Sequence, residues 1–330
     1  MVNCEETREQ GLHMTRKTAA PITVLSLNPA VDMTYEIDHL VPDQKVHAQA
    51  TRHDPGGNGI NVARGLKRIG ASAHCFCVLA GEIGSLLDRL LRGHIDTLTF
   101  ERVAGETRIN GTAIERHSGA QYEISGIGPD IPGEVLDRLL HTFVATTGEG
   151  FAVITGSIQP EVPRDTYARL VERVRDQGGR PVVDARGDLL RLAIEARPFL
   201  IKPNRYELEQ LVGKSLGDIE KVANEARRLQ RSGVETLAVS LGADGLVFVD
   251  GDNSYHASTP RVRVDSTVGA GDSMVAGLVT ALHRGDAIDA VLRLAIACGA
   301  GTVQHAGTEL FQAEELPGLM ERVTVDTLDI

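Results

Sequence analysis

Short apolar runs alternate with amphipathic helical patterns along most of this chain, and this alternation constrains the fold more than any other feature. The strand-like runs lie at 22–27, 73–79, 151–154, 181–184, 199–201, 237–240 and 246–249. Apolar residues at helical spacing occupy about 163–177, a segment beginning at Asn204, 272–284 and 287–304. Strands joined in this way form a largely parallel sheet covered by helices on both faces. The sequence therefore predicts an α/β fold.

Two stretches, 32–54 and 97–125, interrupt this alternation because they show period-two patterning with little helical signal. In the second stretch, a turn at Ser118-Gly119 separates two alternating runs. Such segments are typical of β-hairpins. We expect both stretches to lie outside the main sheet and to form a small lid.

The segment 266–273, Ser-Thr-Val-Gly-Ala-Gly-Asp-Ser, directly precedes a helical pattern. Gly269, Ala270 and Gly271 are therefore expected to open a helix, with Asp272 in its first turn. The first backbone N–H groups of a helix have no partner within it, so they form an anion site. An acid beside an anion site suits the deprotonation of an alcohol during phosphoryl transfer, which points to a kinase. The alternative is a loop that needs glycine for positive φ, with a carboxylate that caps its own helix.

A second glycine-rich turn, 54–62, also leads into a helical pattern. Glycines let the backbone approach a polar ligand closely, and Asn61 can donate and accept hydrogen bonds to hydroxyls. No glycine stands three residues after Gly59, so a dinucleotide-binding fingerprint is not supported. A purely structural tight turn is the alternative.

Asn204 and Glu207 stand three residues apart at the start of a helix, and hence on one face. This pair suits a water-mediated Mg²⁺ site, because Mg²⁺ needs few direct protein ligands. An ordinary capping box, with Asn at the N-cap and Glu at N3, is the alternative and is favoured on spacing alone.

Two isolated charged residues are candidates for ligand binding. Asp32 follows the first predicted strand, and ligands bind at the carboxyl ends of parallel strands in such sheets. Arg108 begins a predicted lid strand, where it would become a phosphate-binding fork if the lid folds over the glycine turn. Loop capping and ordinary surface charge are the respective alternatives.

The best-known phosphate-binding motifs are absent. Gly213-Lys214-Ser215 resembles the end of a Walker A motif, but Leu208 stands where the first glycine is required. The protein-kinase motif set is missing as well. Phosphate binding would therefore depend on the 269–272 turn.

Charge and composition exclude several classes of partner. The formal charge of −11 disfavours nucleic acid or an anionic membrane as the main partner. No apolar run reaches the roughly 18 residues of a membrane span. Residues 1–20 lack the apolar region of a signal peptide, so we expect a disordered tail there. Absent targeting and four cysteines interpreted as reduced thiols favour a cytoplasmic protein.

Taken together and in this order, these segments resemble the ribokinase-like (PfkB) family of carbohydrate kinases, over about residues 21–320. Gly56-Gly57-Asn58-Gly59-Ile60-Asn61-Val62-Ala63-Arg64 is similar to the sugar-binding signature of that family, and 265–272 is similar to its C-terminal signature. The resemblance implies a ribokinase-like three-layer sandwich over 21–330, with a mostly parallel central sheet and a small β-sheet lid from about 32–54 and 97–125.

Within the family, Asn28-Pro29-Ala30-Val31-Asp32 and Thr107-Arg108-Ile109-Asn110 are similar to the phosphofructokinase branch. This branch includes 1-phosphofructokinases, minor 6-phosphofructokinases and tagatose-6-phosphate kinases. Asn58 departs from it, since many members carry Gly or Lys there, and so does Gln159-Pro160-Glu161. The expected reaction is ATP-dependent conversion of fructose 6-phosphate or fructose 1-phosphate to fructose 1,6-bisphosphate. Alternatives are a tagatose-6-phosphate kinase, a kinase of nucleosides or unphosphorylated sugars, and a catalytically silent sensor.

The resemblance also implies roles for individual residues. Asp272 would be the general base, and the backbone of Gly269, Ala270 and Gly271 would stabilise the transferring phosphoryl group. The substrate would be bound by Asp32, Gly56, Gly57, Asn61, Arg108 and Ser157. The ATP site would contain Lys202, Asn204, Ser240, Gly242, Gly245 and Thr267. Asn204 and Glu207 would hold Mg²⁺ through water, and a monovalent cation such as K⁺ would lie by Ser266, Val268, Thr302, His305 and Gly307. A homodimer formed through the lid is the expected assembly.

Overall fold

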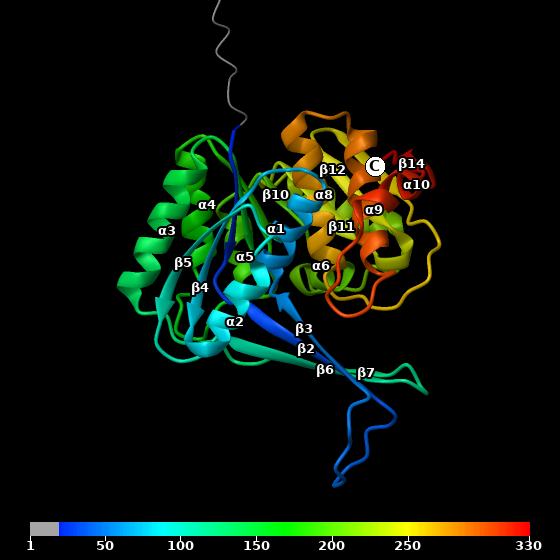
Figure 1. Cartoon of the computed structure of the whole chain (residues 1–330). Coiled ribbons are helices and arrows are strands. Elements are labelled where there is room, and N and C mark those ends of the chain that lie inside the picture. Colours follow the sequence, from blue (N-terminus) through cyan, green and yellow to red (C-terminus); the bar gives the residue numbers. More distant parts are fainter. Residues whose placement is uncertain (1–19) are drawn as a thin grey trace, which may run out of the picture.

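The alternating strands and helices form two β-sheets with flanking helices in a computed structural model, which describes residues 20–330 (Figure 1). The predicted tail lies outside the described residues, apart from Ala20. Within this range the larger sheet has ten strands, in the order β14 (Val325–Thr327), β13 (Asn253–Ala257), β12 (Leu246–Asp250), β11 (Thr236–Ser240), β10 (Leu200–Ile201), β9 (Arg180–Asp184), β8 (Phe151–Thr155), β1 (Ile22–Ser26), β4 (His74–Ala80) and β5 (Thr97–Val103). Neighbours run parallel from β5 to β11 and antiparallel from β11 to β14, which confirms the predicted largely parallel sheet.

Helices cover both faces of this sheet, as predicted. One face carries α1 (Asn58–Arg68), α2 (Gly81–Leu91), α8 (Ala270–Arg284), α9 (Ile288–Thr302) and α10 (Leu316–Glu321). The other carries α3 (Gly133–Thr147), α4 (Thr166–Asp176), α5 (Asp188–Glu195), α6 (Arg205–Val212) and α7 (Ile219–Gln230). In Figure 1, α3 and α4 lie on the opposite side of the body from α8 and α9. The result is a three-layer sandwich.

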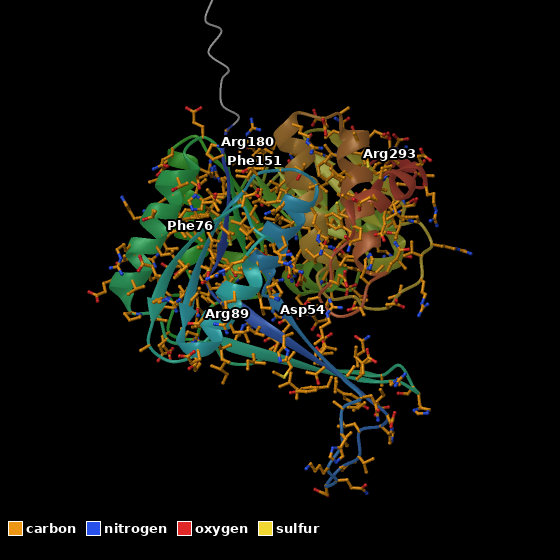
Figure 2. The ribbon with its side chains drawn as sticks, viewed as in Figure 1. Asp54, Phe76, Arg89, Phe151, Arg180 and Arg293 are labelled. Atoms are coloured by element: carbon orange, nitrogen blue, oxygen red, sulfur yellow. The ribbon has the colours of Figure 1, made fainter. Side chains whose placement is uncertain are left out.

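The central strands supply side chains to both core layers, because successive residues of a strand point to opposite faces. In β1, Val24 packs with the α1–α8–α9 layer and Leu25 packs with the α3–α4 layer. Phe76 of β4, labelled in Figure 2, packs edge-on against Phe143 of α3, with ring centroids 5.6 Å apart. Burial on both faces explains why these strands are continuous apolar runs.

The apolar helices and the thiols belong to this core. Cys75, Cys77 and Cys298 are buried and unpaired, as predicted for core thiols, while Cys4 lies outside the described residues. Helices α8 and α9 bury most of their residues against each other and the sheet. No helix in residues 20–330 combines the length and the apolar character that a membrane span requires.

A second, four-stranded sheet projects from one edge of the body as the lid (Figure 1). Its strand order is β3 (Ala50–Gly56), β2 (Ala30–Ile37), β6 (Arg108–Glu115) and β7 (Gln121–Ile124). The lid prediction was wrong for residues 97–103, which form β5 at the edge of the main sheet, parallel to β4. No residue of β5 is fully buried at this sheet edge, so its alternating pattern does not differ from that of a lid strand.

Candidate active site

Asp272 lies in the first turn of α8, as the sequence predicted. Gly269 is the N-cap of this helix and adopts φ 78°, a left-handed conformation that favours glycine. The Asp272 side chain is almost completely buried and accepts two hydrogen bonds from amide groups of α1. Asn58 Nδ2 donates to Oδ1 and Asn61 Nδ2 donates to Oδ2, each over 2.9 Å. The glycine turn at 56–61 and the C-terminal signature, far apart in sequence, therefore meet at this carboxylate.

The surroundings of Asp272 raise its pKa to about 6. Burial is the largest cause, and the negative charge of Asp184 adds to it. The hydrogen bonds from Asn61 and Asn58 and the positive charge of Lys202 act in the opposite direction. A carboxylate with a pKa near 6 is ionised at neutral pH yet is a stronger base than an exposed aspartate, as general-base catalysis requires.

Lys202 lies beside the N-terminus of α8. A Cβ atom placed on Gly271 would come within 3.3 Å of Lys202 Nζ, so this glycine leaves the space that the ammonium group occupies. Lys202 Nζ also lies 3.3 Å from Asp184 Oδ1. Burial favours the neutral amine, but the charges of Asp184, Glu207 and Asp272 outweigh it and raise the pKa of Lys202. A permanent positive charge and free helix N–H groups thus form one anion site next to Asp272.

The glycine turn also accommodates Asp32. A Cβ atom on Gly56 would lie 2.1 Å from Asp32 Oδ2, so only glycine allows the carboxylate its position. Asn110 Nδ2 donates to Asp32 Oδ1 over 2.8 Å, and burial raises the pKa of Asp32 above its usual value. The neighbouring Gly57 has φ 98°, and a Cβ atom there would come within 2.9 Å of Pro29. Both glycines are therefore required by the close approach of the 28–32 segment.

One face of the lid lines a cavity of about 70 Å³ between the lid and the main domain. Paired residues of adjacent strands point to the same face, and the register aligns Asp32 with Asn110 and Thr34 with Thr112. Residues from all four of these positions line the cavity, together with Ser266, Val268, Gly307 and Thr308 from loops of the main domain. The cavity is therefore polar on its lid side.

The opposite face of the lid is apolar and exposed. The register aligns Tyr35 with Ala113, and Ala113 with Tyr122 of β7. Tyr35, Ile109 and Tyr122 are exposed on this face. Ile124, the last residue of β7, is 74% exposed and also contributes to the lining of the cavity. Asp54, labelled in Figure 2, lies near the end of β3 where the lid joins the body.

Arg108 is linked to Ser157 through Asn28. Its Nε and Nη2 atoms both donate to the carbonyl of Asn28, over 3.1 and 2.7 Å. Asn28 Nδ2 in turn donates to Ser157 Oγ over 3.1 Å. Burial lowers the pKa of Arg108, Asp32 raises it, and the nearby positive charge of Arg186 lowers it further. Asn28, Ser157 and Arg186 each follow the end of a strand by two residues, and β1, β8 and β9 are neighbours.

Several residues predicted for the nucleotide site lie at the carboxyl ends of the next strands of the main sheet, β10 and β11. Asn204 and Glu207 form the capping box of α6: each backbone N–H donates to the other side chain, over 2.9 and 2.8 Å. Asn204 also forms an isolated parallel bridge with Ser240. Gly242 begins a short 3-10 helix, Gly242–Asp244. Gly245 has a packing reason of its own, because a Cβ atom there would lie 1.9 Å from the carbonyl oxygen of Ala257.

The loop predicted to hold a monovalent cation adjoins Gly269. Ser266 Oγ donates to the Gly307 carbonyl over 3.0 Å, which joins the two sides of the loop. The Thr302 hydroxyl donates to Ser273 and accepts from the backbone of Phe311, so it is committed to internal hydrogen bonds. His305 Nε2 lies 3.1 Å from Glu315. A cation at this loop would thus be bound by backbone carbonyls. Thr267 is exposed, at the opening of the same turn.

The sequence predicted no role for four residues of this site: Asn58, Arg64, Asp184 and Arg186. Asp184 is the last residue of the predicted strand 181–184 and Arg186 follows it by two positions, so both lie at a carboxyl strand end, where ligands bind in such sheets. Arg64 is buried, and its Nη1 donates to the Pro55 and Thr308 carbonyls and to Asn61 Oδ1. No local spacing predicts the contacts of Asn58 with Asp272 or of Arg64 with Thr308, because these partners lie 214 and 244 positions away in sequence.

The chain as a whole is similar to known proteins in sequence and in structure. The family model of the pfkB family carbohydrate kinases matches residues 25–315 of this chain. The chain is 34% identical over 311 residues to the 1-phosphofructokinase of Rhodobacter capsulatus, covering 93% of this chain and 98% of that protein. It is 32% identical over 298 residues to the 1-phosphofructokinase of Bacillus subtilis (strain 168), covering 90% and 97%. Phosphofructokinase-2 from Escherichia coli, solved in complex with potassium, superimposes with a TM-score of 0.87 at 29% identity, covering 92% of this chain and 98% of that one.

Proposed function

Because this chain belongs to the pfkB family of carbohydrate kinases, and is therefore a phosphotransferase, we propose that it transfers the γ-phosphoryl group of ATP to a fructose phosphate. The product would be fructose 1,6-bisphosphate. The observation that supports the reaction most directly is the buried Asp272 carboxylate, with its pKa near 6, beside the anion site at the N-terminus of α8. Phosphoryl transfer to an alcohol requires a base that removes the hydroxyl proton, next to a site that binds the phosphoryl group.

In this proposal Asp272 accepts the proton of the sugar hydroxyl as that oxygen attacks phosphorus. The backbone N–H groups at 269–271 and the ammonium group of Lys202 stabilise the charge on the transferring phosphoryl oxygens. Catalysis then depends on positioning and electrostatics, as is general for phosphoryl transfer. Asp184 keeps Lys202 charged and in place through their 3.3 Å contact.

The lid side of the cavity would bind the sugar. Asp32, Gly57 and Asn61 would hold its hydroxyls, and Arg108 and Ser157 would bind its phosphate. Arg186 adds a second cation near Arg108, which favours a dianionic group there over a neutral one. This arrangement argues against a nucleoside or an unphosphorylated sugar as the acceptor.

Fructose 1-phosphate is our first candidate acceptor, because the two curated relatives at 34% and 32% identity are both named 1-phosphofructokinase. Fructose 6-phosphate is the second candidate, because phosphofructokinase-2 from Escherichia coli, solved in complex with fructose-6-phosphate, superimposes with a TM-score of 0.86 at 28% identity over 92% of this chain. The two sugars differ in which end of fructose carries the phosphate that Arg108 would bind.

Mg²⁺ and K⁺ are the ions we propose for the reaction. The capping box uses Oε2 of Glu207, which leaves the other carboxylate oxygen for a hydrated ion. Residues 20–330 contain no cluster of three or more His, Cys, Asp or Glu side chains suited to a metal, so phosphates and water would supply most ligands of Mg²⁺. Mg²⁺ bound in this way would neutralise charge on the nucleotide phosphates. K⁺ would lie among the carbonyls of the 266–268 and 302–307 loops.

We also propose that two copies of the chain pair through the apolar outer face of the lid. Exposed apolar patches of this kind mark interaction sites, and this one contains Tyr35, Ile109 and Tyr122. Replacing Tyr35, which is exposed and does not line the cavity, by Glu should convert a dimer into monomers in sedimentation velocity. A wild-type protein that sediments as a monomer at micromolar concentration would remove the proposal.

A coupled ADP-release assay tests the function. Fructose 1-phosphate, fructose 6-phosphate and tagatose 6-phosphate are compared by kcat/KM, with fructose as the unphosphorylated control and with K⁺ exchanged for Na⁺. We expect one of the two fructose phosphates to exceed tagatose 6-phosphate and fructose by at least about tenfold. Asp272→Asn should lower kcat by several orders of magnitude while nucleotide still binds. A wild-type protein that binds sugar phosphate without turnover would instead be a sensor.

A further inference from the structure

Asn58 contacts the proposed base from the open side of the site. It follows Gly57 at the start of α1 and is exposed, whereas Asp272 is almost completely buried. Its Nδ2 atom lies 2.9 Å from Oδ1 of Asp272, and Asn61 Nδ2 lies at the same distance from Oδ2. Each carboxylate oxygen thus has one amide donor, from two different residues of one helix.

The orientation of the Asn61 amide is fixed independently. Arg64 Nη1 donates to Asn61 Oδ1 over 3.3 Å, so the NH₂ group of Asn61 must face Asp272. Arg64 is itself buried and is held by the carbonyls of Pro55 and Thr308. Asn61 is therefore a rigid donor on the inner side of Asp272, and Asn58 is the donor on the outer side.

We infer that Asn58 is a positioning residue for Asp272: its amide holds Oδ1, prevents rotation of the carboxylate and keeps it ionised at neutral pH. This inference rests on the proposed function, in which Asp272 is the base. One hydrogen bond, from Asn61 to the second oxygen, would restrain rotation about the Cβ–Cγ bond less than the two bonds do together.

The charges around Asp272 make this contribution decisive. Burial and the carboxylate of Asp184, from β9, oppose its ionisation. Lys202, which follows β10, and the two amides of α1 favour it. The opposing contributions leave the pKa near 6, so the loss of one donor moves it into the range in which enzymes operate. A hydrogen bond to a charged group is worth enough to shift a pKa by about one unit.

Two substitutions at this position separate positioning from a merely structural role. Asn58→Leu keeps the volume of the side chain and removes the donor. Asn58→Lys places a positive donor near Oδ1. Both residues are compatible with an exposed position in the first turn of a helix. Asn224→Leu, on the exposed surface of α7, is the matched control, since the Asn224 amide donates only to the Glu220 carbonyl of its own helix.

The measurement is kcat against pH at saturating ATP and fructose phosphate, because this profile reports groups in the complex with bound substrates. Asn58→Leu should move the acidic limb up by about one pH unit, which lowers kcat about fivefold at pH 6 and about twofold at pH 7. Asn58→Lys should move the limb down, and Asn224→Leu should leave it unchanged. On the alkaline plateau the carboxylate is ionised in every variant. Any loss of kcat that persists there therefore reports the lost orientation of the carboxylate.

Acidic limbs that coincide with the wild type, or that move in the same direction in both Asn58 variants, would overturn the inference. If Asn58→Leu fails to fold, as judged by its thermal transition, the Lys variant alone decides by the sign of its shift. When wild type is active and Asp272→Asn is not, such a result leaves the proposed function intact. An inactive wild type would overturn both.

Discussion

The substitution Gly56→Ala tests how closely the glycine turn and the lid fit together. Gly56 ends β3 and pairs with Ala30 of β2. An added Cβ atom would lie 2.1 Å from Oδ2, 2.2 Å from Cγ and 2.3 Å from Oδ1 of Asp32. Ordinary contact for such atoms begins near 3.4 Å. The carboxylate must therefore move by more than about 1 Å, and it would lose its 2.8 Å hydrogen bond from Asn110.

The expected cost follows from this displacement. A misplacement of about 1 Å in a substrate-positioning group lowers the rate by about 10²-fold. We therefore expect kcat/KM for the sugar phosphate to fall about 100-fold, equivalent to about 2.7 kcal/mol. The KM for ATP should change by less than about twofold, because Gly56 lies on the sugar side of Asp272.

Steady-state kinetics with each substrate varied in turn provide the assay, and two further variants make it specific. Gly133→Ala is the control, since an added Cβ atom at this first residue of α3 meets nothing within 4 Å. In an Asp32→Ala background the carboxylate is gone, so adding Gly56→Ala should have little further effect. A second 100-fold loss in that background would refute the proposed clash, as would wild-type kinetics for Gly56→Ala alone.

Three other outcomes are expected. Because the pKa of Asp272 is about 6 and the base must be deprotonated, wild-type kcat at saturating substrates should fall about tenfold per unit below that pH; a flat profile down to pH 5 would exclude this base. Arg108→Ala should raise KM for the sugar phosphate by about 30-fold or more, and an equal rise for ATP would contradict its role. Gly245→Ala places a Cβ atom 1.9 Å from the Ala257 carbonyl oxygen at φ 96°. The free energy of unfolding in urea should therefore fall by at least about 3 kcal/mol, and an unchanged value would contradict the predicted clash.

The fold was largely predictable from the sequence, because its central strands are buried on both faces. A continuous apolar run such as 151–154 has few structural alternatives when helices flank it. The edges were harder. Residues 97–103 were predicted to belong to the lid, although they form β5, since an edge strand without fully buried residues and a lid strand share the same alternating pattern. The strand β14, with three residues, is too short to give any pattern.

The site was predictable where local geometry determines a residue's position. The glycines at 269–271 and Asp272 open a helix, so their arrangement follows from adjacent sequence alone. The partners of Asp272 do not follow in this way. Asn58 lies 214 positions away in sequence, and only the packing of α1 against α8 brings its amide to the carboxylate. Asp184 ends a predicted strand, so its place at the sheet edge was predictable, but its 3.3 Å contact with Lys202 depends on how β9 and β10 pair.

Because the two faces of the lid differ in polarity, they limit the insertions and deletions that the protein tolerates. Residues of β6 alternate between the cavity that faces the main domain, as at Asn110, and the exposed apolar face, as at Ile109. Inserting or deleting one residue within β6 would exchange these faces over the rest of the strand, so a single event would remove a polar group from the cavity and bury charge or expose apolar surface elsewhere. The connection 38–49 between β2 and β3 bears no such alternation. Natural length variation should therefore collect in that loop, while the spacing of the lid strands stays fixed.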